Sequence, residues 1–400
     1  MIPADPIALQ PPDAAQRLLL LTARPVLTPI HVDALREIVR GEVVWTQVVN
    51  GAIRNLILHL VRRNLKAHAG DLLPPGLDQW LNYQSRQAVL RQLEIVKIQQ
   101  HIASDLLLPR RIAHAFVKGA TLSAEYYGDP YLRQYRDIDI LLDPDAIYSV
   151  GSELLREGYQ VSNTAWRGMK VQDLSALAKY SAALELRSPT GIYVELHQRL
   201  DNSGCVFTMD VLSQARTDCQ SRGFQGSVLR FVYHYVYLVF HHSRHRWSSL
   251  HWTADLAAMR RRAQDHANEI IQLAEQCGLL ATLQNAELLE RNLDALASTG
   301  VLPADQKQSA FLADCLEALA NSVGPHDDAA MGIVEADRRE PDFPYAWQKT
   351  NGYKIRFQLH RVHPTLDDFN ALPISRPWRW LLYATKPLRV ALGGMRRGAT

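Results

Sequence analysis

Asp137 and Asp139 are separated by one isoleucine and followed by an apolar run, in the stretch DIDILL. Alternate residues of a strand face the same side, so a strand here would present both carboxylates together and turn Ile138 and Ile140 into a core. Neighbouring carboxylates repel each other unless a cation lies between them, and oxygen ligands suit Mg²⁺ or Mn²⁺. The simpler interpretation of so short a pattern is a strand with a solvated polar face.

A short apolar segment upstream of the two aspartates ends in Lys118 and Gly119. This segment is typical of a buried strand, and residues 120–127 directly after it are typical of a helix. Glycine lets a backbone approach a ligand closely, and the N-terminus of a helix offers free N–H groups to phosphate. Lys118 and Gly119 are therefore candidates for contact with phosphate.

A predicted hairpin supplies a third carboxylate. Residues 182–187 and 192–197 are strand-like and flank the turn sequence SPTG, so the second strand carries Glu195. Three carboxylates beside a phosphate-binding turn are what two-metal phosphoryl transfer requires. One ion lowers the pKa of the attacking hydroxyl, and the other neutralises the triphosphate and the leaving pyrophosphate.

Four motifs lie in order along the chain. They are Val117-Lys118-Gly119-Ala120, then Arg133 with Asp137-Ile138-Asp139-Ile140-Leu141-Leu142, then Val194-Glu195-Leu196-His197, and finally a helical motif with His242, His245, Trp247 and Asp255. Together they resemble the uncharacterised nucleotidyltransferase family of bacteria, within the polymerase-β-like nucleotidyltransferase superfamily. The resemblance covers residues 116–259, and the combination of motifs is more specific than any one of them.

The resemblance implies transfer of a nucleoside monophosphate from an NTP, expected to be ATP, to a hydroxyl group, with Mg²⁺ or Mn²⁺. Asp137 and Asp139 match the metal-binding pair, and Glu195 matches the third carboxylate, a base or second-metal ligand. The expected nucleotide contacts are Lys118, Gly119, Ala120, Thr121 and Arg133, whose guanidinium suits phosphate. The expected contacts with the acceptor or a second domain are His197, His242, His245 and Asp255.

Ala120 stands where the superfamily more commonly has serine, and Thr121 is a candidate replacement for that hydroxyl. This departure favours an alternative, a non-catalytic nucleotide-binding or interaction protein, whereas the intact acidic set favours an enzyme. A toxin-like transferase acting on tRNA is a second alternative, and it would require a continuous basic surface around the cleft. The sequence leaves the acceptor open, as a small molecule or a macromolecule.

The composition of the 400 residues is that of an ordinary soluble protein, with a net charge of +3. The four cysteines form no C-x-x-C pair, which fits a reducing compartment. The longest apolar stretch, residues 231–240, is shorter than the roughly 20 residues of a membrane span. We therefore expect a cytoplasmic protein without a transmembrane segment. Residues 370–400 contain basic but no acidic side chains, which favours a docking segment with a solvated basic face over contact with lipid or RNA.

We predict an α+β fold, in which a small mixed-sheet nucleotidyltransferase core is flanked by N-terminal and C-terminal α-helical modules. In the first module an apolar helical face runs from Ile38 to Leu60, and a second long helix runs from Leu77 to Leu106. After Gly204 the chain is expected to return to helices. The predicted divisions are an α-helical module at 1–110, the core at 111–204, an α-helical domain at 205–325 and an irregular or helical basic segment at 326–400.

Overall fold

A computed structural model describes residues 11–162, 183–201, 206–207, 210–218, 224–302 and 315–320, with 355, 359, 363–364, 368, 378 and 380–387. The chain forms two compact units that alternate along the sequence. Unit 1 comprises Met1–Val96, Gly119–Tyr135 and Phe231–Gln348, and unit 2 comprises Lys97–Lys118, Arg136–Arg230 and Lys349–Thr400. The first ten residues of the predicted N-terminal module, and most of the predicted C-terminal segment, lie outside the described residues.

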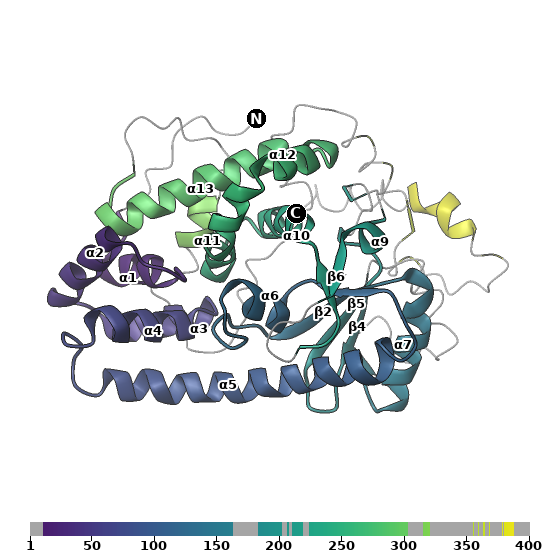
Figure 1. The fold of residues 1–400 in the computed structure, drawn as a ribbon, viewed down its shortest axis with the longest axis horizontal. Helices are drawn as coiled ribbons and strands as arrows, with labels where there is room; N and C mark the ends of the chain where they lie inside the picture. The colour runs from purple at the N-terminus through teal and green to yellow at the C-terminus, as the bar shows by residue number, and fades with distance from the viewer. Residues whose placement is uncertain are drawn as a thin grey trace. The chain divides into compact units, whose positions relative to one another are not determined.

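Within the described residues, unit 2 is built on a seven-stranded mixed sheet with the order β3-β4-β5-β2-β1-β7-β6. The strands are β1 (His114–Phe116), β2 (Asp137–Leu142), β3 (Gln160–Val161), β4 (Ala183–Arg187), β5 (Tyr193–His197), β6 (Arg216–Asp218) and β7 (Ser227–Leu229). β2 lies at the centre, antiparallel to β1 and parallel to β5. A mixed sheet combined with many helices confirms the predicted α+β class (Figure 1).

Helix α7 (Pro144–Arg156) covers β4 and β5 and helps to hold the hairpin that carries Glu195. Asp143 caps the N-terminus of the helix, where its side chain accepts a hydrogen bond from the backbone N–H of Asp145. It packs so closely that a Cβ on Gly151 would lie 2.6 Å from Leu184 Cδ2. The predicted hairpin is confirmed, because β4 and β5 pair in antiparallel register.

Strands β6 and β7 correct the expectation that the chain returns to helices after Gly204. β7 pairs in parallel with β1, with Phe116 opposite Val228, and β6 pairs with β7. Both strands are three residues long. Segments this short contain too few positions for a period-two pattern to appear. Pairing with strands far away in the sequence, rather than a local pattern, forms this end of the sheet.

Unit 1 is helical. Its helices are α1 (Ala14–Thr22), α2 (Pro29–Arg40), α3 (Trp45–Arg54), α4 (Leu58–Ala69), the first part of α5 (Leu77–His101), α6 (Gly119–Tyr126), α10 (Phe231–Arg244), α11 (Leu250–Asp265), α12 (Ala267–Gln276) and α13 (Leu280–Thr299). The long helix predicted from Leu77 to Leu106 is confirmed as α5 and a π-helical turn at Ile102–Leu107. No helix among the described residues is long and apolar enough to cross a membrane.

The apolar face predicted from Ile38 to Leu60 belongs to three helices rather than one. The chain leaves helical geometry at Gly41, after α2, and again at Leu56, whose φ is 56°. Ile38, Val48 and Leu60 are nevertheless all buried. The periodicity continues through the breaks because α2, α3 and α4 each bury one face in unit 1, so apolar spacing alone does not locate the breaks.

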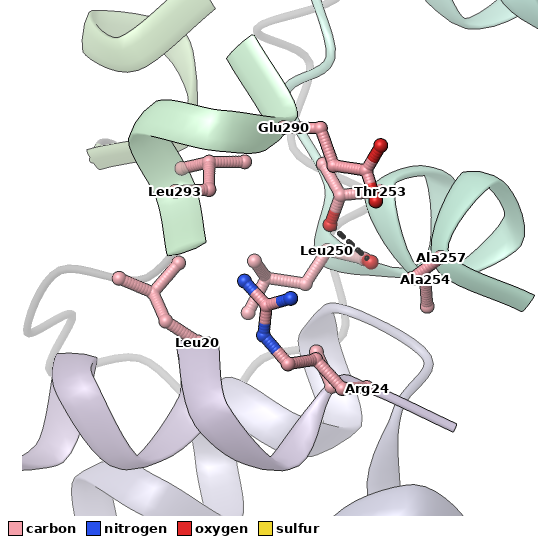
Figure 2. Close-up of a pocket in the computed structure, with 9 residues that line it drawn as sticks. Leu20, Arg24, Leu250, Thr253, Ala254, Ala257, Glu290 and Leu293 are labelled. Atoms are coloured by element: carbon pink, nitrogen blue, oxygen red, sulfur yellow. Dashed lines mark hydrogen bonds between the residues drawn. The ribbon is translucent and has the colours of Figure 1, made fainter. Parts of the chain in front are cut away.

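The interior of unit 1 contains a cavity of about 20 Å³ (Figure 2). Its lining comes from the end of α1, from α11 and from α13: Leu20, Ala23, Arg24, Leu250, Thr253, Ala254, Ala257, Glu290 and Leu293. The Thr253 hydroxyl turns back to its own helix and donates to the Leu250 carbonyl over 2.9 Å. The cavity has room for about one water molecule, so it is far too small for a nucleotide.

Gly226 provides a test of how the sheet holds β1, the strand that leads to Lys118. Its φ is +122°, and an added Cβ would lie 2.8 Å from Phe116 Cε2 and 3.0 Å from His114 Nε2. We expect Gly226→Ala to lower the free energy of unfolding by about 2–4 kcal/mol, because backbone strain and overpacking add. Urea denaturation followed by circular dichroism measures this change.

Gly158→Ala is the matched control in the same unit. Gly158 also has a positive φ, +90°, but an added Cβ there meets only Pro189 Cγ at an ordinary 3.6 Å. The control should therefore cost about 1–2 kcal/mol, from backbone strain alone. Equal losses for the two variants would contradict the packing described around Phe116.

Candidate functional site

The pairing of β2 with β5 determines which acidic residues meet. In this parallel pair Asp139 lies opposite Glu195, and Asp137 lies opposite Tyr193. Asp137 and Asp139 share one face of β2 because side chains alternate along a strand. Asp139 is buried, whereas Asp137, at the start of the strand, is half-buried.

Four side chains form what we call the Asp139 cluster: Lys118, Asp139, Glu195 and His197. Lys118 Nζ lies 3.0 Å from Asp139 Oδ1, and His197 Nε2 lies 3.0 Å from the same oxygen. His197 Nε2 is also 3.2 Å from Glu195 Oε2. Lys118 follows β1, Asp139 lies on β2, and Glu195 and His197 lie on β5, so three adjacent strands supply the cluster.

In the Asp139 cluster, each charged side chain stabilises the ionised form of its oppositely charged neighbours. Burial alone would raise the pKa of Asp139, but the Lys118 ammonium and the His197 imidazolium hold that pKa well below its usual range. Burial likewise opposes ionisation of Glu195, yet the hydrogen bond with His197 lowers its pKa. Burial disfavours the His197 imidazolium, but hydrogen bonds with Asp139 and Glu195 raise its pKa to about 9. Near neutral pH the metal-free cluster therefore holds two anions and two cations.

The donor atoms of the cluster suit a divalent cation. The ligand atoms offered by Asp139, Glu195 and His197 all lie within 4.8 Å of one another. Asp139 Oδ2 is buried and has no hydrogen-bond partner among the described residues. A buried carboxylate oxygen without a partner is costly, so a ligand for that oxygen is expected. The two carboxylates suit Mg²⁺ or Mn²⁺, which prefer oxygen ligands.

The predicted phosphate-binding turn begins directly after β1. The backbone N–H of Val117 donates to the Asp139 carbonyl over 3.2 Å, which holds the residue before Lys118 against β2. Gly119 has a φ of +69°, in the left-handed region that favours glycine, and it opens α6 in unit 1. Ala120 and Thr121 are buried in the first turn of that helix.

Three other predicted site residues, Arg133, His242 and Asp255, meet in unit 1. Together with Tyr127, which the sequence did not mark, they form what we call the Asp255 group. The Arg133 guanidinium donates to both carboxylate oxygens of Asp255, and both side chains are buried. His242 Nε2 lies 3.2 Å from Asp255 Oδ2. His245 is half-buried, and its ring centroid lies 4.8 Å from that of Trp252.

Two contacts were not foreseen from the sequence. His197 was expected to contact the acceptor, and the structure also brings it to both carboxylates of the Asp139 cluster. The spacing in Val-Glu-Leu-His contained that signal, since residues two apart on a strand share a face. The Tyr127 hydroxyl donates to Asp255 Oδ1 over 2.7 Å, and no local pattern marked this tyrosine.

The protonation of His197 is directly measurable. A raised folded-state pKa means that the imidazolium stabilises the metal-free protein fully below its unfolded pKa near 6.5. This contribution is lost as the pH rises through about 9. NMR titration of the imidazole nitrogens, with a chelator present, should therefore show His197 protonated at pH 7.5. In Asp139→Asn its pKa should fall, and a pKa near 6.5 in the wild type would contradict the described contacts.

One comparison with known proteins identifies a relationship. A family described as uncharacterised nucleotidyltransferase matches residues 41–293. This match covers well over half of the chain and includes every residue of the Asp139 cluster and of the Asp255 group. No curated protein matches the sequence.

Proposed function

The chain belongs to the uncharacterised nucleotidyltransferase family, and on that premise we propose that it transfers a nucleoside monophosphate from an NTP to a hydroxyl group of an acceptor. The proposed donor is ATP, the proposed cation is Mg²⁺, and pyrophosphate is released. The observation that carries the proposal is the pairing of Asp139 with Glu195, in which Asp139 Oδ2 is buried without a hydrogen-bond partner among the described residues.

Asp139 and Glu195 would hold the cation, and Asp137, on the same face of β2, is the proposed additional carboxylate. When bound, a divalent cation neutralises phosphate charge and lowers the pKa of an attacking hydroxyl. The donor set supports this assignment because its ligand atoms already lie within 4.8 Å of one another in the cluster that includes His197.

Lys118 and the turn after it are proposed to bind the triphosphate. The Lys118 ammonium, 3.0 Å from Asp139 Oδ1, is a cationic side chain in direct contact with the acidic cluster. A lysine in this place can move from carboxylate to phosphate without leaving the site, because its stem is long and flexible. Backbone N–H groups at the start of α6, after Gly119, would add further donors.

The transfer itself needs one bond made and one bond broken. The acceptor oxygen bonds to the α-phosphorus, the bond from the α-phosphorus to the α–β bridging oxygen breaks, and pyrophosphate leaves with that electron pair. The hydroxyl proton passes to the Glu195 carboxylate. Glu195 suits this role because its side chain is 32% exposed, whereas that of Asp139 is only 1% exposed. His197, whose Nε2 lies 3.0 Å from Asp139 Oδ1 and 3.2 Å from Glu195 Oε2, would hold both carboxylates in place.

Removing one acidic charge at a time tests the site. Asp137→Asn and Asp139→Asn keep the shape of each side chain and should each weaken Mg²⁺-dependent NTP binding by about tenfold or more, while abolishing transfer. Calorimetric titration of each NTP, with and without Mg²⁺, measures the affinity and identifies the donor base. Asp145→Asn, which changes an exposed acid on α7 in the same unit, should bind as the wild type does.

The same titrations separate the proposal from its main alternative. Metal-dependent binding that is lost in Asp139→Asn supports the site, and pyrophosphate release on addition of an acceptor supports transfer. Binding without any release of pyrophosphate, over a broad panel of hydroxyl acceptors, would favour a non-catalytic nucleotide-binding protein. Normal turnover by folded Asp139→Asn would contradict the role given to that residue.

A further inference from the structure

We propose that the Asp255 group positions the nucleotide site through the chain, with Arg133 acting on Asp255 rather than on the triphosphate. The proposal rests on the function proposed above. The segment through which the Asp255 group would act is residues 119–135, which we call the connection. It links the phosphate-binding turn to the strand that carries Asp137 and Asp139. Both ends of this connection lead directly into predicted site residues, Lys118 at one end and Asp137 shortly after the other.

Arg133 and Asp255 form a two-point ion pair. Arg133 Nε donates to Asp255 Oδ1 over 2.6 Å, and Arg133 Nη2 donates to Oδ2 over 2.9 Å. Arg133 Nη1 donates to the Gln134 carbonyl over 3.3 Å, so all three guanidinium nitrogens have acceptors. The Arg133 side chain is 5% exposed and that of Asp255 is 0% exposed. A contact between this guanidinium and phosphate would require breaking a buried pair, which is strongly unfavourable.

The backbone of Arg133 is fixed as firmly as its side chain. Its N–H donates to Ser123 Oγ over 3.0 Å, and its carbonyl accepts from Gln92 Nε2 over 2.9 Å. Ser123 Oγ in turn donates to the Asp129 carbonyl over 2.6 Å. The connection is therefore tied to itself and to α5 at the residue that Asp255 holds.

The residues after Arg133 are also held, up to the end of the connection. Gln134 Oε1 accepts from the backbone N–H of Leu58 over 2.8 Å, and the Tyr135 hydroxyl donates to the Pro130 carbonyl over 3.1 Å. Gln134 and Tyr135 are both buried. Only Arg136, which is exposed, separates this fixed segment from Asp137. If the backbone at Arg133 moved, only three residues would be available to take up the movement before β2 begins at Asp137.

Two other motif residues, His242 on α10 and Trp247 in the turn between α10 and α11, support Asp255. His242 Nε2 lies 3.2 Å from Asp255 Oδ2, and the His242 ring centroid lies 5.3 Å from that of Trp247. Trp247 is fully buried although its φ is 54°, and Arg246 before it has a φ of 56°. Non-glycine residues in the left-handed region persist only where the surroundings over-determine them. The His-Trp-Asp motif therefore builds the buried support for one carboxylate.

The experiment compares Mg·ATP affinity and melting temperature in variants of the full chain. Asp255→Asn removes the charge but keeps the shape, and Arg133→Lys keeps the charge but cannot form the two-point pair. We expect each to weaken Mg·ATP binding by about tenfold or more in protein that is folded at the assay temperature. Tyr127→Phe, which leaves the ion pair intact, should fold and weaken binding by less than Asp255→Asn.

Asp294→Asn is the control for general destabilisation of unit 1. Asp294 Oδ1 lies 2.7 Å from Arg24 Nη1, and Arg24 is buried, but neither residue belongs to the connection. This variant should lower the melting temperature and leave the Mg·ATP affinity within about twofold of the wild type. An equal loss of affinity in Asp294→Asn and Asp255→Asn would overturn the proposal, because the effect would then be unspecific.

Arg133 could bind phosphate or act by positioning the connection, and these two roles predict different Mg·ATP affinities for Asp255→Asn. If Arg133 is a phosphate ligand, Arg133→Lys loses affinity while Asp255→Asn binds Mg·ATP normally, and this result would overturn the proposal. Asp139→Asn serves as the reference in the same titration. If it binds Mg·ATP as tightly as the wild type, the proposed function fails and the inference falls with it. If only Asp139→Asn loses affinity, the inference alone fails.

Discussion

The site depends on the register of β2 against β5, because that register sets Asp139 opposite Glu195. Two carboxylates so close repel each other, and burial makes the repulsion stronger. The neighbouring strands supply the compensation, with Lys118 after β1 and His197 on β5. A shift of one residue in the register would turn the acidic residues toward the opposite face of the sheet. The apolar residues of β2 that alternate with the aspartates therefore fix the register that brings the acidic residues together, and they also build the core.

The helical unit contributes a second group of buried charges, of a different kind. In the Asp139 cluster a carboxylate oxygen is left without a hydrogen-bond partner among the described residues. In the Asp255 group, by contrast, arginine, tyrosine and histidine side chains all surround a single carboxylate. The Asp139 cluster therefore suits reversible binding of a ligand. The Asp255 group, in which both carboxylate oxygens have donors, suits a permanent structural support. Residues 119–135 belong to the helical unit but begin and end beside site residues in the chain, so they connect the two groups.

The sequence predicted the parts of the fold that have strong local patterns. The D-x-D strand, the helix after Gly119 and the hairpin with Glu195 were all confirmed, because apolar alternation and turn residues mark those segments locally. β6 and β7 were missed because their pairing is non-local, and the breaks among α2, α3 and α4 were missed because apolar periodicity continues across them. Arg133 was predicted to bind phosphate from its residue type, but its partner Asp255 is 122 positions away. A buried pair at that separation leaves no local signal, so its role stays a prediction for experiment.

The most direct test of the account is to locate a bound cation. Crystals grown with Mn²⁺ and a non-hydrolysable ATP analogue would show the ion through its anomalous scattering. We expect a peak within bonding distance of Asp139 Oδ2 and of a Glu195 oxygen, with the triphosphate beside Lys118. An analogue bound with no Mn²⁺ at these two carboxylates, or with Mn²⁺ held elsewhere, would contradict the central claim that the β2–β5 register builds a metal-dependent nucleotide site.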